Sequence, residues 1–244
     1  MDAKSTQSSG FYDFLAWLDA NWKKVVIGAV GVVVVVAAIA FFKWKERQSE
    51  IDANRALFSL TGLSAMGTNG VSPDELAKIA QQHPNTSAGE RAQLLAAGAA
   101  FDQGDYAKAQ SHFDAVLKGS PAAGFKAQAT FGVAASLEAQ KNFDQAIQKY
   151  EEVARQYPKE NVAPQAKLAI GRIYEAQGKP EEALKLYSEV QNKQDQFEYW
   201  QGEAAERKDR LVSRHPELKE QANAGFTDQI IEVTTPPAPD ATNP

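Results

Sequence analysis

The sequence contains no cysteine and only three histidines in 244 residues. Without cysteine the chain can form no disulfide, thiolate metal site, cysteine nucleophile or lipidated cysteine anchor. The formal net charge is −5 and there is no long basic run, so the composition does not favour binding to nucleic acid through phosphate contacts. The histidines, His83, His112 and His215, lack the spacing of metal ligands, so no metal site is predicted.

Catalytic motifs are missing as well. The sequence holds no G-x-x-x-x-G-K-[ST], G-x-S-x-G or H-E-x-x-H pattern. Acidic pairs such as Glu151-Glu152 and Glu181-Glu182 fall on predicted helix surfaces or first turns, where carboxylates interact favourably with the helix dipole. We therefore expect a protein that is not an enzyme and has no cofactor or small-molecule substrate. A carboxylate-based hydrolase is the weakest alternative, because nothing in the sequence selects a catalytic pair.

One apolar run stands out near the N-terminus. Residues 25–42, VVIGAVGVVVVVAAIAFF, contain no charged or strongly polar side chain. As a helix this run would extend about 27 Å, close to the thickness of a bilayer core of about 30 Å. Aromatic and basic residues suited to the two membrane surfaces flank it: Trp22, Lys23, Lys24, Lys43, Trp44, Lys45 and Arg47. The pattern predicts a transmembrane helix over residues 25–42.

A cleaved signal peptide is the alternative interpretation of the same run. Ala38, Ile39 and Ala40 form an A-x-A pattern, and cleavage after it would release a soluble secreted domain that begins at Phe41. The apolar run continues through Phe42, however. The preceding segment is also long for a signal peptide and carries three aspartates, Asp2, Asp13 and Asp19. These features favour an uncleaved anchor.

Residues 1–24 form a separate amphipathic segment. One helical face of it would carry Phe11, Phe14, Leu15, Leu18 and Trp22, so we expect this segment to lie in the membrane interface. Basic residues after the apolar run slightly outnumber those before it, which favours a cytoplasmic location for the rest of the chain by positive-inside counting. A long downstream domain can cross a membrane despite such a bias, so the charges leave the orientation open.

The rest of the chain repeats with a period of 37 residues. Four sets of equivalent positions, which we call columns, recur at this interval: Ala109, Ala146 and Ala183; Phe113, Tyr150 and Tyr187; Val116, Val153 and Val190; and Ala97, Ala134 and Gly171. Each unit is predicted to be a helical hairpin, with turns at Gly104-Asp105, Lys141-Asn142 and Gly178-Lys179. The small residues let the two helices approach closely, and the aromatic and valine columns fill the space between them. Prolines are expected to end the second helices at Pro121 and Pro158.

The units resemble the tetratricopeptide repeat. The resemblance rests on a small residue in the first helix, an A-x-x-x-[FY] pair in the second and a closing proline; the pairs are Ala109 with Phe113, Ala146 with Tyr150 and Ala183 with Tyr187. The usual tryptophan of the first helix is missing, Asp195 replaces the third proline, and each unit is longer than the usual repeat of about 34 residues. The predicted fold is all-α, an N-terminal transmembrane helix followed by a tetratricopeptide-repeat-like solenoid.

The register extends to both sides of the three clear units. Residues 43–89 are predicted to form a connecting helix and a degenerate first repeat, on the evidence of Leu57, Leu60, Leu63, Gly67, Leu76, Ile79 and Pro84. Residues 90–225 hold the repeats and a capping helix over 198–213, in which we expect Arg207, Lys208, Asp209 and Arg210 to face solvent. Residues 226–244, with the sequence PPAPDATNP, indicate a disordered tail.

In this architecture the first helices of stacked units line a concave face that can receive an extended or helical polypeptide. The resemblance implies groove positions in each of the three units. These candidate protein-binding residues are Arg91, Phe101, Asp102, Gln128, Phe131, Glu138, Gln165, Arg172 and Glu175.

The layout as a whole resembles the ancillary subunit family of the bacterial SecYEG translocon. FYDFLAWLDANWKK before one spanning helix, KWKERQSEIDANRALF after it, and three or four divergent repeats carry this resemblance. It implies a single-pass inner-membrane protein with a cytoplasmic N-terminus and periplasmic repeats. The implied partners are the SecYEG translocon, a membrane-tethered periplasmic chaperone and the membrane lipid.

We therefore expect an adaptor that links the translocon to periplasmic chaperones or to nascent secreted proteins. A cell-envelope scaffold for division or outer-membrane assembly is one alternative. A secreted soluble repeat protein is the other, if the N-terminal segment is cleaved.

Overall fold

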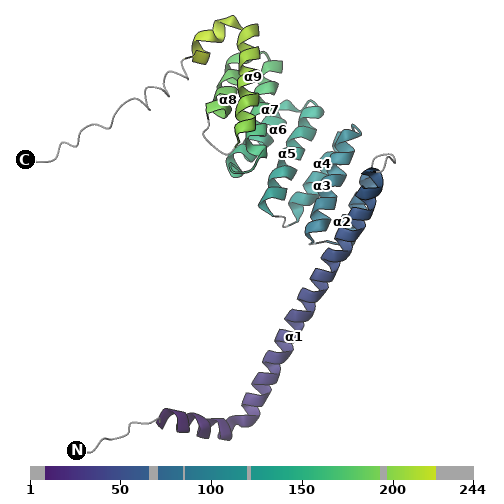
Figure 1. Cartoon of the computed structure of the whole chain (residues 1–244), viewed down its shortest axis with the longest axis vertical. Coiled ribbons are helices and arrows are strands. Elements are labelled where there is room, and N and C mark those ends of the chain that lie inside the picture. The colour runs from purple at the N-terminus through teal and green to yellow at the C-terminus, as the bar shows by residue number, and fades with distance from the viewer. Residues whose placement is uncertain (1–8, 66–70, 85, 120–121, 193–196, 224–244) are drawn as a thin grey trace, which may run out of the picture. The chain divides into compact units, whose positions relative to one another are not determined.

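The computed structural model describes residues 9–65, 71–84, 86–119, 122–192 and 197–223, with the backbone alone for 9–13 and 63–65 (Figure 1). Within these ranges the secondary structure is helical and no strand occurs, which confirms the predicted all-α class. Pro121, Asp195, Gly67 and the predicted tail over 226–244 lie outside the described residues. The chain divides into two units, Met1–Asp52 and Ala53–Pro244.

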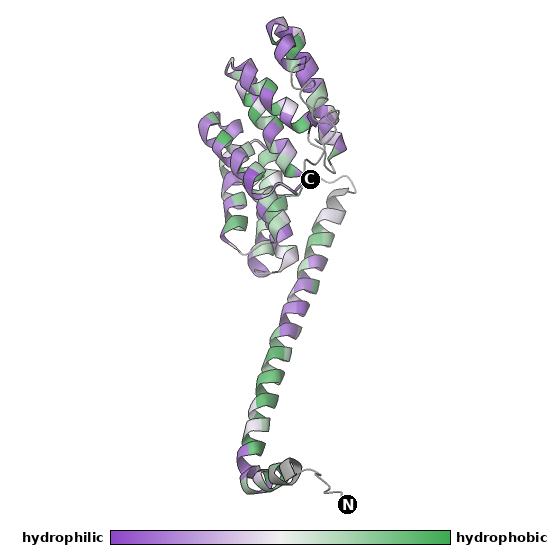
Figure 2. Ribbon diagram, turned by 90° about the vertical axis from the view of Figure 1, so that its left-hand side faces the viewer, coloured by the Kyte–Doolittle hydropathy of each residue, from purple (hydrophilic) through white to green (hydrophobic). Residues whose placement is uncertain are grey.

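The first unit consists of most of one long helix, α1, which extends from Ser9 to Ala65. Its apolar stretch forms a continuous hydrophobic band (Figure 2), and side chains along the stretch, such as Ile27, Val33 and Phe42, are exposed. By length and composition α1 can cross a membrane, and no part of its most apolar window is buried inside the protein. The same properties fit a signal sequence, so the helix alone does not separate the two interpretations.

The second unit is an array of helical hairpins that begins with the last turns of α1. Its remaining helices are α2 (Pro73–Gln82), α3 (Ser87–Asp102), α4 (Tyr106–Lys118), α5 (Ala123–Ala139), α6 (Phe143–Gln156), α7 (Val162–Ala176), α8 (Pro180–Asn192), α9 (Glu198–Arg214) and a short 3-10 helix (Pro216–Leu218). Each helix packs against the next, and α3, α5, α7 and α9 also contact one another in sequence (Figure 1). No comparable contact joins α4, α6 and α8. The first helices therefore line the inner, concave side of the array.

Three hairpin turns have the same local structure and confirm the predicted turn positions. Gly104, Lys141 and Gly178 have φ values of 81°, 64° and 71°, in the left-handed region. In each turn the next amide N–H donates back to a helix carbonyl, for example from Asn142 to Leu137 at 2.9 Å. Such a bond satisfies a carbonyl that the helix end would otherwise leave without a partner. α6 ends at Gln156, just before Pro158, as predicted.

The aromatic column packs on the first helices, both within a hairpin and between neighbouring hairpins. Phe113, Tyr150 and Tyr187 are at most 9% exposed. A Cβ atom at Gly132 would overlap the ring of Phe113, and one at Gly171 would overlap the ring of Tyr187. The small residues are therefore needed because bulky rings pack directly on the backbone of the first helices.

The two ends of the array complete the fold. At the start, Leu57 of α1 packs with Leu76 and Ile79 of α2 and with alanines of α3, in the columns of the predicted degenerate repeat. At the other end α9 matches the predicted capping helix, and Leu211 is fully buried against the last unit. One prediction for α9 was wrong in part. Asp209 and Arg210 are exposed, but Arg207 and Lys208 are half-buried, because α9 packs on α8 and also contacts α7.

Candidate protein-binding surface

All nine predicted groove residues lie on the first helices, α3, α5 and α7, which form what we term the concave face. Arg91, Asp102, Gln128 and Arg172 are exposed on it. The other five are half-buried: Phe101, Phe131, Glu138, Gln165 and Glu175. Most of the half-buried residues contact neighbouring helices, so the nine positions divide into residues that hold the array together and residues available to a ligand.

The carboxylate of Glu138 on α5 joins two neighbouring repeats. Arg172 of α7 donates to it in a forked arrangement, with Nη2 at 2.8 Å from Oε1 and 2.9 Å from Oε2 and with Nε at 3.1 Å from Oε1. The hydroxyl of Tyr150 on α6 donates to Oε2 at 2.8 Å. Forked guanidinium–carboxylate pairs are the strongest and most directional ion pairs in proteins. We call this set of three residues the first clamp.

Electrostatics in the first clamp keep both donors protonated. Burial, followed by the nearby Glu138 carboxylate, raises the pKa of the Tyr150 hydroxyl. Burial alone would lower the pKa of Arg172, but the hydrogen bond and charge of Glu138 outweigh it and the pKa is raised. Tyr150 and Arg172 therefore both remain hydrogen-bond donors to Glu138 over the physiological range of pH.

The same arrangement recurs one repeat later. The Tyr187 hydroxyl on α8 donates to Oε1 of Glu175 at 2.5 Å, and Arg214 of α9 donates to Oε2 of the same carboxylate. Burial and then the hydrogen bond to Glu175 raise the pKa of Tyr187. We call Glu175, Tyr187 and Arg214 the second clamp. Our sequence analysis missed both clamps, although the recurrence of Glu and Tyr in step with the repeat was a usable signal.

The remaining predicted residues differ in how accessible they are. Phe131 packs edge-to-face on Tyr150, with ring centroids 5.2 Å apart, and Phe101 does the same on Tyr106 at 5.1 Å. The Gln165 side chain donates to the carbonyl of Asn161 at 3.3 Å. Gln128, Arg91 and Asp102 are left as the exposed positions where a bound polypeptide can reach the concave face.

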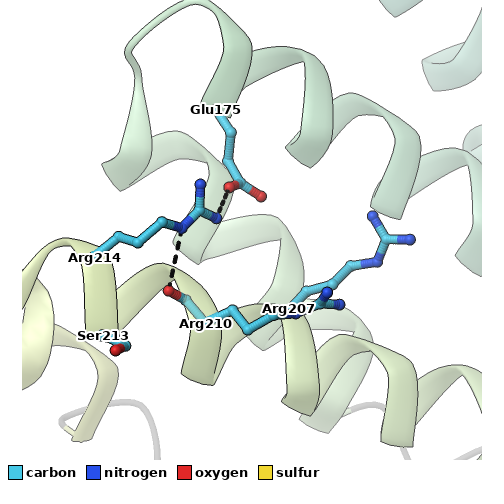
Figure 3. A pocket seen from close by; sticks show the side chains of 5 residues that line it. All are labelled: Glu175, Arg207, Arg210, Ser213 and Arg214. Atoms are coloured by element: carbon cyan, nitrogen blue, oxygen red, sulfur yellow. Dashed lines mark hydrogen bonds and ion pairs between the residues drawn. The ribbon is translucent and has the colours of Figure 1, made fainter.

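A pocket of about 540 Å³ lies beside the second clamp (Figure 3). It is lined by Glu175 of α7 and by Arg207, Arg210, Ser213 and Arg214 of α9. Figure 3 shows Arg214 reaching Glu175, with its Nε group also bonded to the carbonyl of Arg210. Sequence analysis assigned Arg207 and Arg210 to a capping surface and did not consider Arg214, although the spacing of the three along α9 is that of a single helical face.

A second hollow of about 480 Å³ lies on the opposite layer, between α6 and α8. Ala154, Ile170, Tyr174 and Leu186 give it an apolar floor, and charged side chains of both signs surround that floor: Glu151, Arg155, Lys167, Glu182, Lys185 and Glu189. Lys167 and Glu189 pair across it at 2.8 Å. We call this hollow the outer trough. It was not predicted from the sequence, because its floor combines side chains of α7 with side chains of α6 and α8.

Metal binding receives no support from the side chains that the structure places. Within the described ranges, no group of three or more His, Asp or Glu residues is arranged to hold an ion. His112 instead contacts Gln93, whose Nε2 lies 2.9 Å from its Nδ1. Burial is the main cause that lowers the pKa of His112, and the charge of Lys108 is the second.

Comparison with protein families identifies the repeats. The model of a family described as the tetratricopeptide repeat-like domain matches residues 15–201, more than half of the chain. The chain belongs to this tetratricopeptide repeat-like family. The match confirms the resemblance drawn from the alanine and aromatic columns, and it begins inside α1. A comparison with curated proteins finds no match.

Proposed function

We propose that the protein is a membrane-anchored adaptor whose concave face binds a polypeptide. Membership of the tetratricopeptide repeat-like family supports the binding role, since such repeats generally serve protein interactions. The exposed apolar stretch of α1 supports the anchor, because so much exposed apolar surface is unfavourable in water.

The proposal rests mainly on one observation, that the concave face contains both residues bonded between helices and residues exposed to solvent. The clamps join α5, α7 and α9, while Gln128 on α5 and Arg91 and Asp102 on α3 remain exposed. A surface that is rigid before binding loses less conformational entropy when a ligand docks. The clamps therefore preorganise the concave face without occupying all of it.

The more specific proposal concerns the partners. The sequence layout, with its amphipathic start, single apolar helix and divergent repeats, supports an ancillary role at the Sec translocon of a bacterial inner membrane. In this arrangement the N-terminus is cytoplasmic and the repeats are periplasmic. The concave face then binds a membrane-tethered periplasmic chaperone or a nascent secreted protein beside SecYEG.

Site-specific photo-crosslinking in native membranes tests the binding face. A photoreactive residue at Gln128, exposed on α5, is expected to capture translocon or chaperone components. The matched control is Gln148, a glutamine equally classed as exposed, on the second helix α6. Identical adducts at the two positions would contradict binding by the concave face. Capture of division or outer-membrane assembly factors at Gln128 would instead favour the scaffold alternative.

Protease accessibility of a C-terminal tag tests the orientation. In spheroplasts with an intact inner membrane, added protease is expected to remove the tag, since the proposed repeats are periplasmic. A tag that becomes accessible only after permeabilisation would place the repeats in the cytoplasm. Recovery of the tagged repeats in the soluble fraction would show that α1 is cleaved as a signal peptide.

A further inference from the structure

The arginine pocket lies where the concave face continues onto α9. Arg214 donates to Glu175 of the preceding first helix, as Arg172 donates to Glu138, but through Nη2 alone rather than through a fork. Arg207 precedes Arg214 by seven residues, as Gln165 precedes Arg172, so Arg207 occupies the groove position of Gln165 on the next helix. α9 therefore does more than cap the array. It extends the ligand-facing surface by one helix.

The side chains that line this pocket are mostly cationic. Its lining contains three guanidinium groups and one carboxylate. The carboxylate, Glu175, already accepts from Tyr187 through one oxygen and from Arg214 through the other. Both oxygens of this carboxylate are therefore engaged in the second clamp.

Arg207 and Arg210 each pair with a glutamate of their own helix, and Arg207 also interacts with the Tyr187 hydroxyl on α8. Arg207 donates through Nε to Glu203 at 2.8 Å. The guanidinium of Arg210 lies 3.7 Å from Glu206, and both of these side chains are more than half exposed. The exposed Arg210–Glu206 pair contributes little to stability, so Arg210 can pair with a ligand instead. Each arginine can present further N–H donors to a ligand, since a guanidinium carries five.

We propose that this pocket binds a carboxylate of an acidic polypeptide segment that lies along the concave face. The proposal rests on the proposed function and adds the chemistry of the ligand. Guanidinium groups bind carboxylates through paired hydrogen bonds, and the pocket volume of about 540 Å³ accommodates an acidic side chain with its adjoining backbone. The carboxylate comes from an Asp or Glu side chain or from a chain terminus.

Fluorescence anisotropy with the full chain in a non-ionic detergent provides the test. The probe is a labelled ten-residue peptide with four glutamates and an amidated C-terminus, compared with its all-glutamine counterpart. We expect the glutamate peptide to bind about tenfold more tightly at low salt and the difference to shrink at 0.5 M salt. A third peptide, with glutamines and a free C-terminus, shows whether a terminal carboxylate alone suffices.

Variants locate the binding to the pocket. Arg207→Gln and Arg210→Gln are each expected to weaken binding of the glutamate peptide by about fivefold, since each removes a charged donor. Arg210→Lys keeps the charge but loses the fork, so an intermediate loss is expected. Arg155→Gln is the matched control, because it removes the same charge from the outer trough. Thermal unfolding of every variant checks that the array is intact, and Arg210 is exposed enough for its replacement to be tolerated.

Each outcome bears on the proposal. Equal binding of the glutamate peptide and both glutamine peptides, or equal losses in Arg210→Gln and Arg155→Gln, would overturn it. Preference for the free terminus would assign the carboxylate to a chain end, and preference for the glutamates would assign it to side chains. Crosslinking at Gln128 is independent of the arginines. If Gln128 gives specific adducts but Arg210→Gln does not change peptide binding, the carboxylate site is rejected and the adaptor function stands. If Gln128 gives no specific adducts, the adaptor function itself is rejected.

Discussion

Neighbouring repeats are joined in two chemically different ways within one array. Between α5 and α7, Glu138, Tyr150 and Arg172 form a charged clamp across the interface. One repeat earlier the equivalent columns hold Phe101, Phe113 and Ala135, which pack together as apolar groups. The comparison teaches that the repeat specifies where neighbouring helices meet but not which interaction joins them.

The largest effect is expected for Glu138→Ala. The change leaves the Arg172 guanidinium and the Tyr150 hydroxyl without their shared acceptor, so we expect a loss of about 2–3 kcal/mol in the free energy of unfolding. Urea denaturation of the full chain in detergent, followed by circular dichroism, measures it. Glu151→Ala, at an exposed position on α6, is the control and should change stability by less than about 0.5 kcal/mol. Equal losses in the two variants would show that the clamp contributes nothing.

Tyr150→Phe gives the α5–α6 repeat the residue that the α3–α4 repeat has at the equivalent position, Phe113. The ring stays in the core while the hydrogen bond to Glu138 is lost, so we expect a loss of about 1.5 kcal/mol. Phe113→Tyr is the reverse change. It should also destabilise the array, because the position equivalent to Glu138 in the α3–α4 repeat is Phe101. Phe101 cannot accept a hydrogen bond from the new hydroxyl. Thermal unfolding compares the two variants, and a stabilising Phe113→Tyr would contradict the assignment.

A pH dependence near neutrality is expected from His112 in the α3–α4 repeat. His112 has Lys149 and Leu186 as its counterparts in the later repeats. Burial and then Lys108 lower its pKa from 6.5, against the opposing charges of Asp74 and Asp105. The unfolded chain thus takes up a proton first, so stability falls as the pH drops below about 6.5 and continues to fall through the lowered folded pKa. His112→Gln should flatten this part of a plot of melting temperature against pH, and an unchanged plot would contradict it.

The smallest effect is expected at the middle turn. Lys141 has a φ of 64°, where the other two turns have Gly104 and Gly178. Glycine adopts this backbone conformation without the steric penalty of a Cβ atom, so Lys141→Gly should stabilise the array by about 0.5 kcal/mol. Thermal unfolding of the full chain would detect the gain. Gly178→Ala is the opposite control and should destabilise the array.

Much of the fold could be predicted because repetition gives several independent indications of the same structure. The Ala109, Phe113 and Val116 columns placed the helices, and the three turns fell at the predicted residues. The binding positions could be predicted only as helix faces. Glu138 and Arg172 were both proposed as groove residues, yet they bond to each other across 34 residues of sequence. No spacing rule within one helix indicates that pairing.

The sequence by itself determined an all-helical chain with one apolar helix and a 37-residue repeat, because hydrophobic periodicity and the placement of small residues act locally and recur. The tertiary structure alone decided which polar groups meet. Stacking of α7 and α9 brings Glu175 to Tyr187 and Arg214 and leaves Arg207 and Arg210 at an open pocket. The physical reason is that hydrogen bonds and charge pairing depend on distances of a few ångströms between residues remote in sequence, and only packing sets those distances.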